Sequence, residues 1–253
     1  MQQLLLIARD GAIVHEEYAD GFDARTPHAL YSGTKSFWGI AALEARSDGL
    51  LDLDEPVRGA ITVRMLLSLT AGYGFGGLGT AAPTYDRAWE IVPKDPPDTR
   101  FTYGGIPLQV FGSFFAQRLR PSGRTPHDYL RERVLAPAGV TVAGWRTLKD
   151  GTHPLPTGAQ MDGTNWLAYG TYVLARHERY REAFTGSSAN ARYGLGWWLN
   201  GPRLPADLFY ASGSGGQGLY VIPSRGLVAV RFADRGSANH PAVVKKILSS
   251  AAP

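Results

Sequence analysis

Ser32 and Lys35 lie three residues apart in the segment Ser-Gly-Thr-Lys, at the start of a predicted helix. This spacing places both side chains on one face of a helix, one turn apart. A serine near a helix N-terminus is activated as a nucleophile, and a lysine in an apolar wall can lose its charge and accept a proton. The pair is therefore a candidate for nucleophilic catalysis. The alternative is that Ser32 only caps the helix.

A tyrosine in a glycine turn is the second candidate. Tyr103 precedes Gly104 and Gly105, directly before a predicted helix, so that its hydroxyl could project into a cleft. A tyrosinate is a competent base if a neighbouring ammonium lowers its pKa, and Lys35 is the natural neighbour. The alternative is an ordinary half-buried tyrosine.

A run of small residues in segment 211–217 is the third candidate. Ser212, Gly213 and Ser214 lie at the edge of a predicted strand, where glycines let a substrate carbonyl approach the backbone. A backbone N–H in such a segment can face an oxyanion. The alternative is a flexible hairpin.

Other motifs do not have the context that their chemistry needs. Two G-x-G-x-x-G matches, at 72–77 and 213–218, lack the strand, turn and helix of a dinucleotide site. The chain has no phosphate-loop motif, no G-x-S-x-G elbow and no cysteine. Its six histidines are far apart in the sequence and form no i, i+4 pair. We therefore expect neither a cofactor nor a metal.

Composition excludes several classes of protein. The 253 residues suffice for one large domain or two small ones, and a hydrophobic content of 44% supports a substantial core. Basic residues are scattered despite a net charge of +4, so we expect no nucleic-acid partner. No apolar run approaches the roughly 18 to 20 residues of a bilayer span, so we expect no membrane span. The chain as given is expected to be cytoplasmic, or periplasmic or secreted if a leader was removed. The oligomeric state stays open.

Strands are expected at both ends of the chain and helices between them. Two apolar runs around Asp10-Gly11 predict an N-terminal hairpin. Aromatic and β-branched runs predict a meander of strands at 193–199, 207–212, 217–223 and 226–232. Spacing and capping signals predict helices at 32–46, 62–69, 105–118, from Thr125 onward, at 164–175 and at 240–250. We expect an α+β fold, with hairpin and meander in one antiparallel sheet flanked by helices and the central, mostly helical region inserted as a lobe.

In this order and spacing, the Ser-x-x-Lys, Tyr-Gly-Gly and Ser-Gly-Ser-Gly-Gly segments resemble those of the penicillin-recognising serine hydrolases. The nearest group comprises class C β-lactamase-like esterases, amidases and D-alanyl-D-alanine peptidases. Segments similar to those of this group occur along nearly the whole chain, among them LDLDEPV, VRMLLSLTAG and YGLGWW. The resemblance implies a β-lactamase/transpeptidase-like fold in a single catalytic domain, 1–253. It also implies an α/β lobe made of 1–49 and 151–253, a helical lobe at 50–150, and a site at their seam.

The resemblance assigns a role to each candidate residue. Ser32 would be the acylated nucleophile, Lys35 its partner, and Tyr103 the base and then the acid. Backbone N–H groups of Ser32 and Ser214 would form the oxyanion hole. The segment that holds oxyanion and substrate would comprise Ser212, Gly213 and Ser214. The substrate would be a small ester, amide or lactam.

Two departures from the family pattern bear on the substrate. Gly105 stands where the family has an asparagine that would contact a substrate amide, and Ala211 stands where the family has lysine or histidine. The second change removes the positive charge expected to meet the carboxylate of a β-lactam or peptide. Together they favour a carboxylesterase for small, largely uncharged esters. The alternatives are a weak β-lactamase, a D-amino-acid peptidase or amidase, and a catalytically inactive relative that only binds a ligand.

An apolar acyl or alcohol group would need apolar walls in this cleft. The aromatic residues expected to supply them are Tyr73, Trp89, Trp197, Trp198 and Tyr210.

Overall fold

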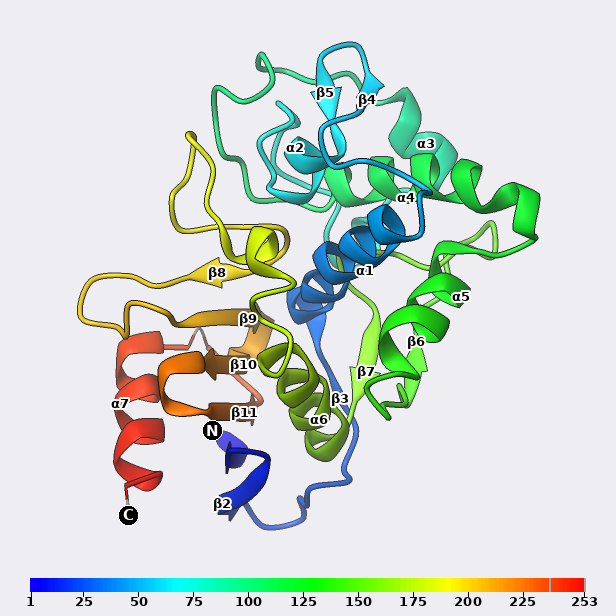
Figure 1. Ribbon diagram of the computed structural model, residues 1–253. Coiled ribbons are helices and arrows are strands. Elements are labelled where there is room, and N and C mark those ends of the chain that lie inside the picture. Colours follow the sequence, from blue (N-terminus) through cyan, green and yellow to red (C-terminus); the bar gives the residue numbers. More distant parts are fainter. Residues whose placement is uncertain (237, 253) are drawn as a thin grey trace.

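The computed structural model describes residues 1–236 and 238–252, and the largest sheet in these residues has six antiparallel strands in the order β2-β1-β11-β10-β9-β8. The N-terminal hairpin and the C-terminal meander therefore share one sheet, as the sequence predicts (Figure 1). The strands are β1 (Gln2–Arg9), β2 (Ala12–Tyr18), β8 (Trp198–Leu199), β9 (Phe209–Gly213), β10 (Gln217–Ile222) and β11 (Leu227–Ala233).

Alternating side chains give the sheet two buried faces. In β1, Leu4 and Leu6 belong to the larger hydrophobic core, whereas Leu5 and Ile7 pack on the opposite side. This follows from the two-residue period of a strand. Helix α6 (Gly163–Leu174) covers the first face and α7 (His240–Ser250) the second, and Figure 1 shows these two helices on opposite sides of the sheet.

The part of the chain between residues 50 and 150 is mostly helical and rich in loops. Figure 1 shows α1 (Ser36–Ser47) between this region and the sheet. The elements of this region are β4 (Pro56–Arg58), β5 (Ile61–Thr62), α2 (Val63–Leu67), α3 (Tyr85–Glu90), α4 (Ile106–Leu119), α5 (Pro126–Leu130) and β6 (Gly144–Trp145). Strand β6 joins β3 (His28–Ala29) and β7 (Ala159–Met161) in a small sheet.

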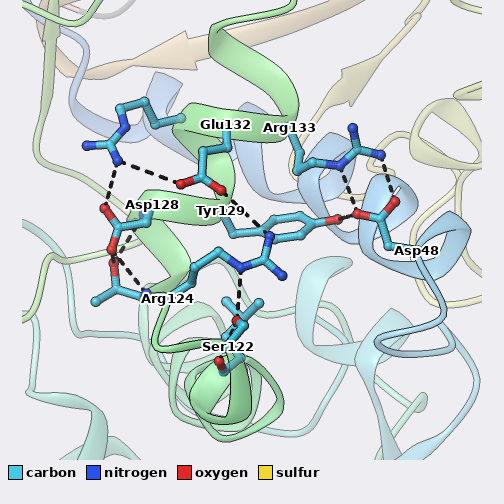
Figure 2. Close-up of polar contacts among 10 residues, drawn as sticks. Asp48, Ser122, Arg124, Asp128, Tyr129, Glu132 and Arg133 are labelled. Atoms are coloured by element: carbon cyan, nitrogen blue, oxygen red, sulfur yellow. Dashed lines mark hydrogen bonds and ion pairs between the residues drawn. The ribbon is translucent and has the colours of Figure 1, made fainter.

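A polar cluster fastens the end of α1 to α5. Asp48, the C-cap of α1, accepts a hydrogen bond of 2.6 Å from the hydroxyl of Tyr129 and two from the guanidinium of Arg133, at 2.8 and 2.6 Å (Figure 2). These bonds lower the pKa of Asp48, chiefly through Arg133. Figure 2 also shows Asp128 of the capping box that begins α5. The cluster therefore anchors the C-terminal end of α1, whose N-terminal end follows the segment that carries Ser32 and Lys35.

Two predicted elements differ from the structure. The helix expected over 32–46 begins as a tight 3₁₀ turn, Tyr31–Lys35, and becomes α-helical only from Ser36. The strand expected over 193–199 is wrong except for β8. Its glycines form a turn instead, and Gly196, at φ +82°, approaches the carbonyl of Lys35 so closely that a Cβ would lie 2.3 Å from that oxygen. The glycines thus allow two backbone segments to approach closely and do not form the hydrogen-bonded ladder of a strand.

No helix among the described residues combines the length and the apolar character that crossing a bilayer requires.

Candidate active site

The 3₁₀ turn places Ser32 at a cleft and Lys35 beneath it. Ser32 is half-buried, while Lys35 is only 1% exposed. The residue before the serine, Tyr31, has a left-handed backbone at φ +47°, a conformation that costs energy for a tyrosine. The sharp turn keeps the Ser32 hydroxyl at the surface while the chain descends into the core.

Lys35 has the properties of a base poised for the Ser32 proton. Its Nζ lies 2.9 Å from Oγ of Ser32 and 3.2 Å from the carbonyl oxygen of Pro156. Burial disfavours the ammonium and lowers the pKa of Lys35 to about 7. A substantial share of the side chain is therefore a neutral amine at neutral pH, able to accept a proton.

Tyr103 lies beside Ser32 and Lys35, and its phenol is protonated, so that it can donate a proton. Nζ of Lys35 is 4.8 Å from the centre of the Tyr103 ring, which stacks on Trp198 at 5.4 Å between centroids. Burial raises the pKa of the phenol, and hydrogen bonding by Ser32 and Trp198 offsets part of that rise. A lowering of this pKa by the Lys35 ammonium, expected from the sequence, is not found. The pKa is raised instead, because desolvation of the buried phenol has the largest effect.

The glycine segment reaches the nucleophile along β9. Gly213 approaches the carbonyl of Leu30 so closely that a Cβ would lie 2.1 Å from that oxygen. This contact brings Ser214 next to the turn that carries Ser32. Both serines line a cleft of about 530 Å³, whose described lining residues are Ser32, Leu78, Tyr103, Trp198, Tyr210, Ser212, Gly213, Ser214, Gly236, Ala238 and His240. The structure thus brings every residue singled out for this site to one place, with Lys35 at its floor.

The absence of a side chain at Gly105 has a steric reason. A Cβ at this position would lie 1.9 Å from the carbonyl oxygen of Gly77, and the Gly105 amide donates a hydrogen bond of 2.7 Å to the carbonyl of Gly76. The glycine-rich loop around residue 77 therefore occupies the space that a side chain at 105 would need. The first of the G-x-G-x-x-G matches forms part of this loop.

Two of the five expected aromatic residues line the cleft. These are Trp198 and Tyr210. Tyr73 and Trp197 are buried in the core instead, with exposed fractions of 1% and 0%. Trp89 lies on α3 and is absent from the cleft's lining. Neighbouring residues in sequence point to different sides of the chain, and this separates Trp197 from Trp198.

Two histidines that are far apart in the sequence come together, and a third lines the cleft. The rings of His127 and His153 lie 4.5 Å apart between centroids, and His240 lines the cleft. Among residues 1–236 and 238–252, no group of three or more histidine, aspartate or glutamate side chains could hold a metal ion. No local sequence pattern connects His240 with Ser212, 28 residues earlier, so a role for His240 could not be predicted from the sequence.

A half-buried serine lies beside a buried, weakly basic lysine in a cleft at the edge of an antiparallel sheet. This arrangement is typical of serine hydrolases. The chain belongs to the Beta-lactamase family, whose family model matches residues 4–177. It is thus a β-lactamase-family serine hydrolase. No curated protein matches the sequence.

Solved structures share the fold over almost the whole chain. A β-lactamase from Mycobacterium bovis is 21% identical, with a TM-score of 0.73 over 97% of this chain and 93% of that one. EstCE1, a hydrolase with promiscuous acyltransferase activity, is 17% identical, with a TM-score of 0.76 over 98% and 93%. A D-stereospecific amidohydrolase from Streptomyces sp. is 15% identical, with a TM-score of 0.70 over 95% and 92%. At these identities the likeness shows the β-lactamase/transpeptidase fold and no particular substrate.

Proposed function

We propose that this protein is a carboxylesterase that hydrolyses small, largely uncharged esters through an acyl-enzyme on Ser32. The observation that carries the proposal is the 2.9 Å contact between Ser32 Oγ and the amine of Lys35, whose pKa burial lowers to about 7. A serine becomes an effective nucleophile when a neutral base is within hydrogen-bond reach.

The character of the cleft supports an uncharged substrate. None of the described residues that line it carries an aspartate, glutamate, lysine or arginine side chain. His240 is neutral at pH 7 because burial lowers its pKa to about 4. A carboxylate would have to leave water and would meet no cation among these lining residues, since the nearby Arg231 guanidinium is hydrogen-bonded to the Gly216 carbonyl. Trp198 and Tyr210 offer apolar surface to an acyl or alcohol group.

Acylation then proceeds with defined proton movements. Lys35 takes the proton of Ser32 as Oγ attacks the ester carbonyl, and the backbone N–H groups of Ser32 and Ser214 hold the oxyanion. The bond to the alcohol oxygen breaks as the Tyr103 phenol, which is protonated because its pKa is raised, donates its proton to that oxygen. The Lys35 ammonium returns a proton to Tyr103. The alcohol leaves and Ser32 carries the acyl group.

Deacylation repeats these steps with water. Lys35, neutral again, takes a proton from a water molecule that attacks the acyl carbonyl. The same two N–H groups hold the second oxyanion. The bond to Ser32 Oγ breaks, Oγ takes the proton from the Lys35 ammonium, and the carboxylic acid is released.

A substrate panel tests this proposal. p-Nitrophenyl esters of short acids, an anilide of the same acid and the β-lactam nitrocefin are offered to the wild-type protein and to Ser32→Ala. We expect ester turnover at least a hundredfold faster than anilide or lactam turnover, and loss of ester turnover in the variant. Faster nitrocefin or anilide turnover would make the protein a lactamase or amidase. Equal ester turnover by Ser32→Ala would contradict the nucleophile, and no turnover by either protein would favour a ligand-binding relative.

A further inference from the structure

A histidine without a predicted role reaches the cleft from the C-terminal helix. His240 is the first residue of α7 and lines the cleft together with Ser212. Its Nε2 lies 3.4 Å from Oγ of Ser212, and its Nδ1 lies 3.0 Å from Oη of Tyr220. Three polar side chains, from β10, α7 and β9, therefore form one hydrogen-bonded chain that ends in the cleft at Ser212.

The register of the sheet builds this chain. Ser212 of β9 pairs with Gly218 of β10, and Tyr210 pairs with Tyr220, so that these positions share the face that α7 covers. Gly218 has no side chain, and a Cβ there would lie 2.8 Å from Oη of Tyr220. The Tyr220 phenol can therefore lie across Gly218, toward the residue that pairs with it. Tyr210 completes the wall, with its ring 4.5 Å from that of His240.

One arrangement of the protons leaves a donor for the cleft. Burial raises the pKa of Tyr220, which is 1% exposed, so its hydroxyl keeps a proton that it can donate to Nδ1 of His240. Burial lowers the pKa of His240 to about 4, and a neutral imidazole that accepts at Nδ1 carries its proton on Nε2. That proton is directed at Ser212 Oγ. The hydroxyl proton of Ser212 itself is then available to the cleft.

We propose that the Tyr220–His240–Ser212 chain sets substrate specificity by presenting the Ser212 hydroxyl as a hydrogen-bond donor to an uncharged oxygen of the substrate. The inference rests on the proposed esterase function and names the substrate class: esters whose acyl part bears a second neutral oxygen, such as an ether. Ser212 would contact the substrate, whereas His240 and Tyr220 are positioning residues that act through it. Arg231, the charged neighbour of His240, donates a hydrogen bond to the Gly216 carbonyl and is not among the described residues that line the cleft. One neutral donor in that lining suits a neutral acceptor better than a carboxylate.

Two esters of equal length test the proposal. p-Nitrophenyl methoxyacetate and p-nitrophenyl butyrate differ by one oxygen in place of a methylene. The readout is the kcat/KM for the methoxyacetate divided by the kcat/KM for the butyrate. We expect the ratio to fall about fivefold in Ser212→Ala and in His240→Phe, the value of one neutral hydrogen bond. Comparing ratios between proteins cancels the different intrinsic reactivity of the two esters.

Tyr220→Phe is the decisive variant, because it removes only a buried hydroxyl that does not line the cleft. Without that donor, the imidazole can hold its proton on Nδ1 and accept the Ser212 proton at Nε2, which takes the donor away from the substrate. We expect the ratio to fall in the same direction as in Ser212→Ala. Tyr85→Phe is the matched control, since Tyr85 is also buried and donates one hydrogen bond, to the His153 carbonyl.

The outcomes separate the two proposals. A wild-type protein that hydrolyses neither ester overturns the proposed function and this inference with it. An active Tyr220→Phe protein with the wild-type ratio overturns the inference alone. So does an equal loss of both activities, because that pattern indicates only a structural role. A shifted ratio in Tyr220→Phe and an unshifted ratio in Tyr85→Phe support it.

Discussion

Replacing Lys35 with methionine should make the protein more stable at low pH while greatly lowering its activity. The folded protein holds Lys35 with a pKa of about 7, whereas the ordinary value is 10.5, so folding at pH 6 requires burying the charge or losing a proton. This difference costs roughly 4 kcal/mol at and below pH 7. Methionine has a similar volume and no charge, so it removes this cost.

The variant also loses the hydrogen bonds of Lys35 to Ser32 and to the Pro156 carbonyl, worth about 1 kcal/mol each. The net gain at pH 6 is therefore about 2 kcal/mol. Between pH 7 and 10.5 the unfolded wild-type chain binds one proton more than the folded protein, so wild-type stability rises with pH. The variant lacks this rise. Near pH 10 we expect Lys35→Met to be less stable than the wild type by about 1 kcal/mol.

Urea unfolding followed by tryptophan fluorescence, at pH 6 and at pH 10, measures both differences. Ester turnover should fall by about 10²- to 10⁴-fold in the same variant, because the general base is gone. A stability difference between variant and wild type that is the same at both pH values would refute the reasoning, since it would mean that Lys35 keeps its ordinary pKa in the folded protein.

Three further substitutions probe the site and its support. Tyr103→Phe should lower kcat by about 10²- to 10⁴-fold in a steady-state assay with little change in the unfolding free energy, and near-wild-type turnover would assign all proton transfer to Lys35. Gly105→Asn should lower the free energy of unfolding in urea by about 2 kcal/mol or more, because the new Cβ meets the Gly77 carbonyl. Gly144→Ala should cost far less, because a Cβ at residue 144 would have no atom within 3.4 Å. Asp48→Asn should cost about 1 to 2 kcal/mol at pH 7, and this difference should shrink as the pH falls below about 4, because the lowered pKa of Asp48 stabilises the fold only while the carboxylate is charged. A difference that does not change with pH would contradict that origin.

Local sequence signals predicted the elements that local physics determines. Asp10 and Gly11 both have positive φ, as a two-residue hairpin turn requires. Thr125 and Asp128 form the capping box that begins α5. The helix expected over 240–250 has the same bounds in the structure. Each of these features depends on residues that are close together in the sequence.

The features that the sequence did not reveal depend on tertiary packing. His240 meets Ser212 because α7 covers one face of the sheet and the register of β9 with β10 places Ser212 on that face. The raised pKa of Tyr103 follows from desolvation, which depends on every element packed around it. A motif shows that three side chains are present, but not how far they are desolvated, and desolvation is the largest influence on the pKa values of Lys35 and Tyr103.

The most direct test of whether neutral Lys35 activates Ser32 is the rate at which a fluorophosphonate modifies the protein, measured by intact mass from pH 5 to pH 10. We predict one adduct, which maps to Ser32 and is absent from Ser32→Ala. The rate of its formation should rise with pH, with a midpoint near pH 7. No adduct, or an adduct that persists in Ser32→Ala, would contradict the nucleophile. A rate that keeps rising up to pH 10 would contradict the assignment of Lys35 as the base.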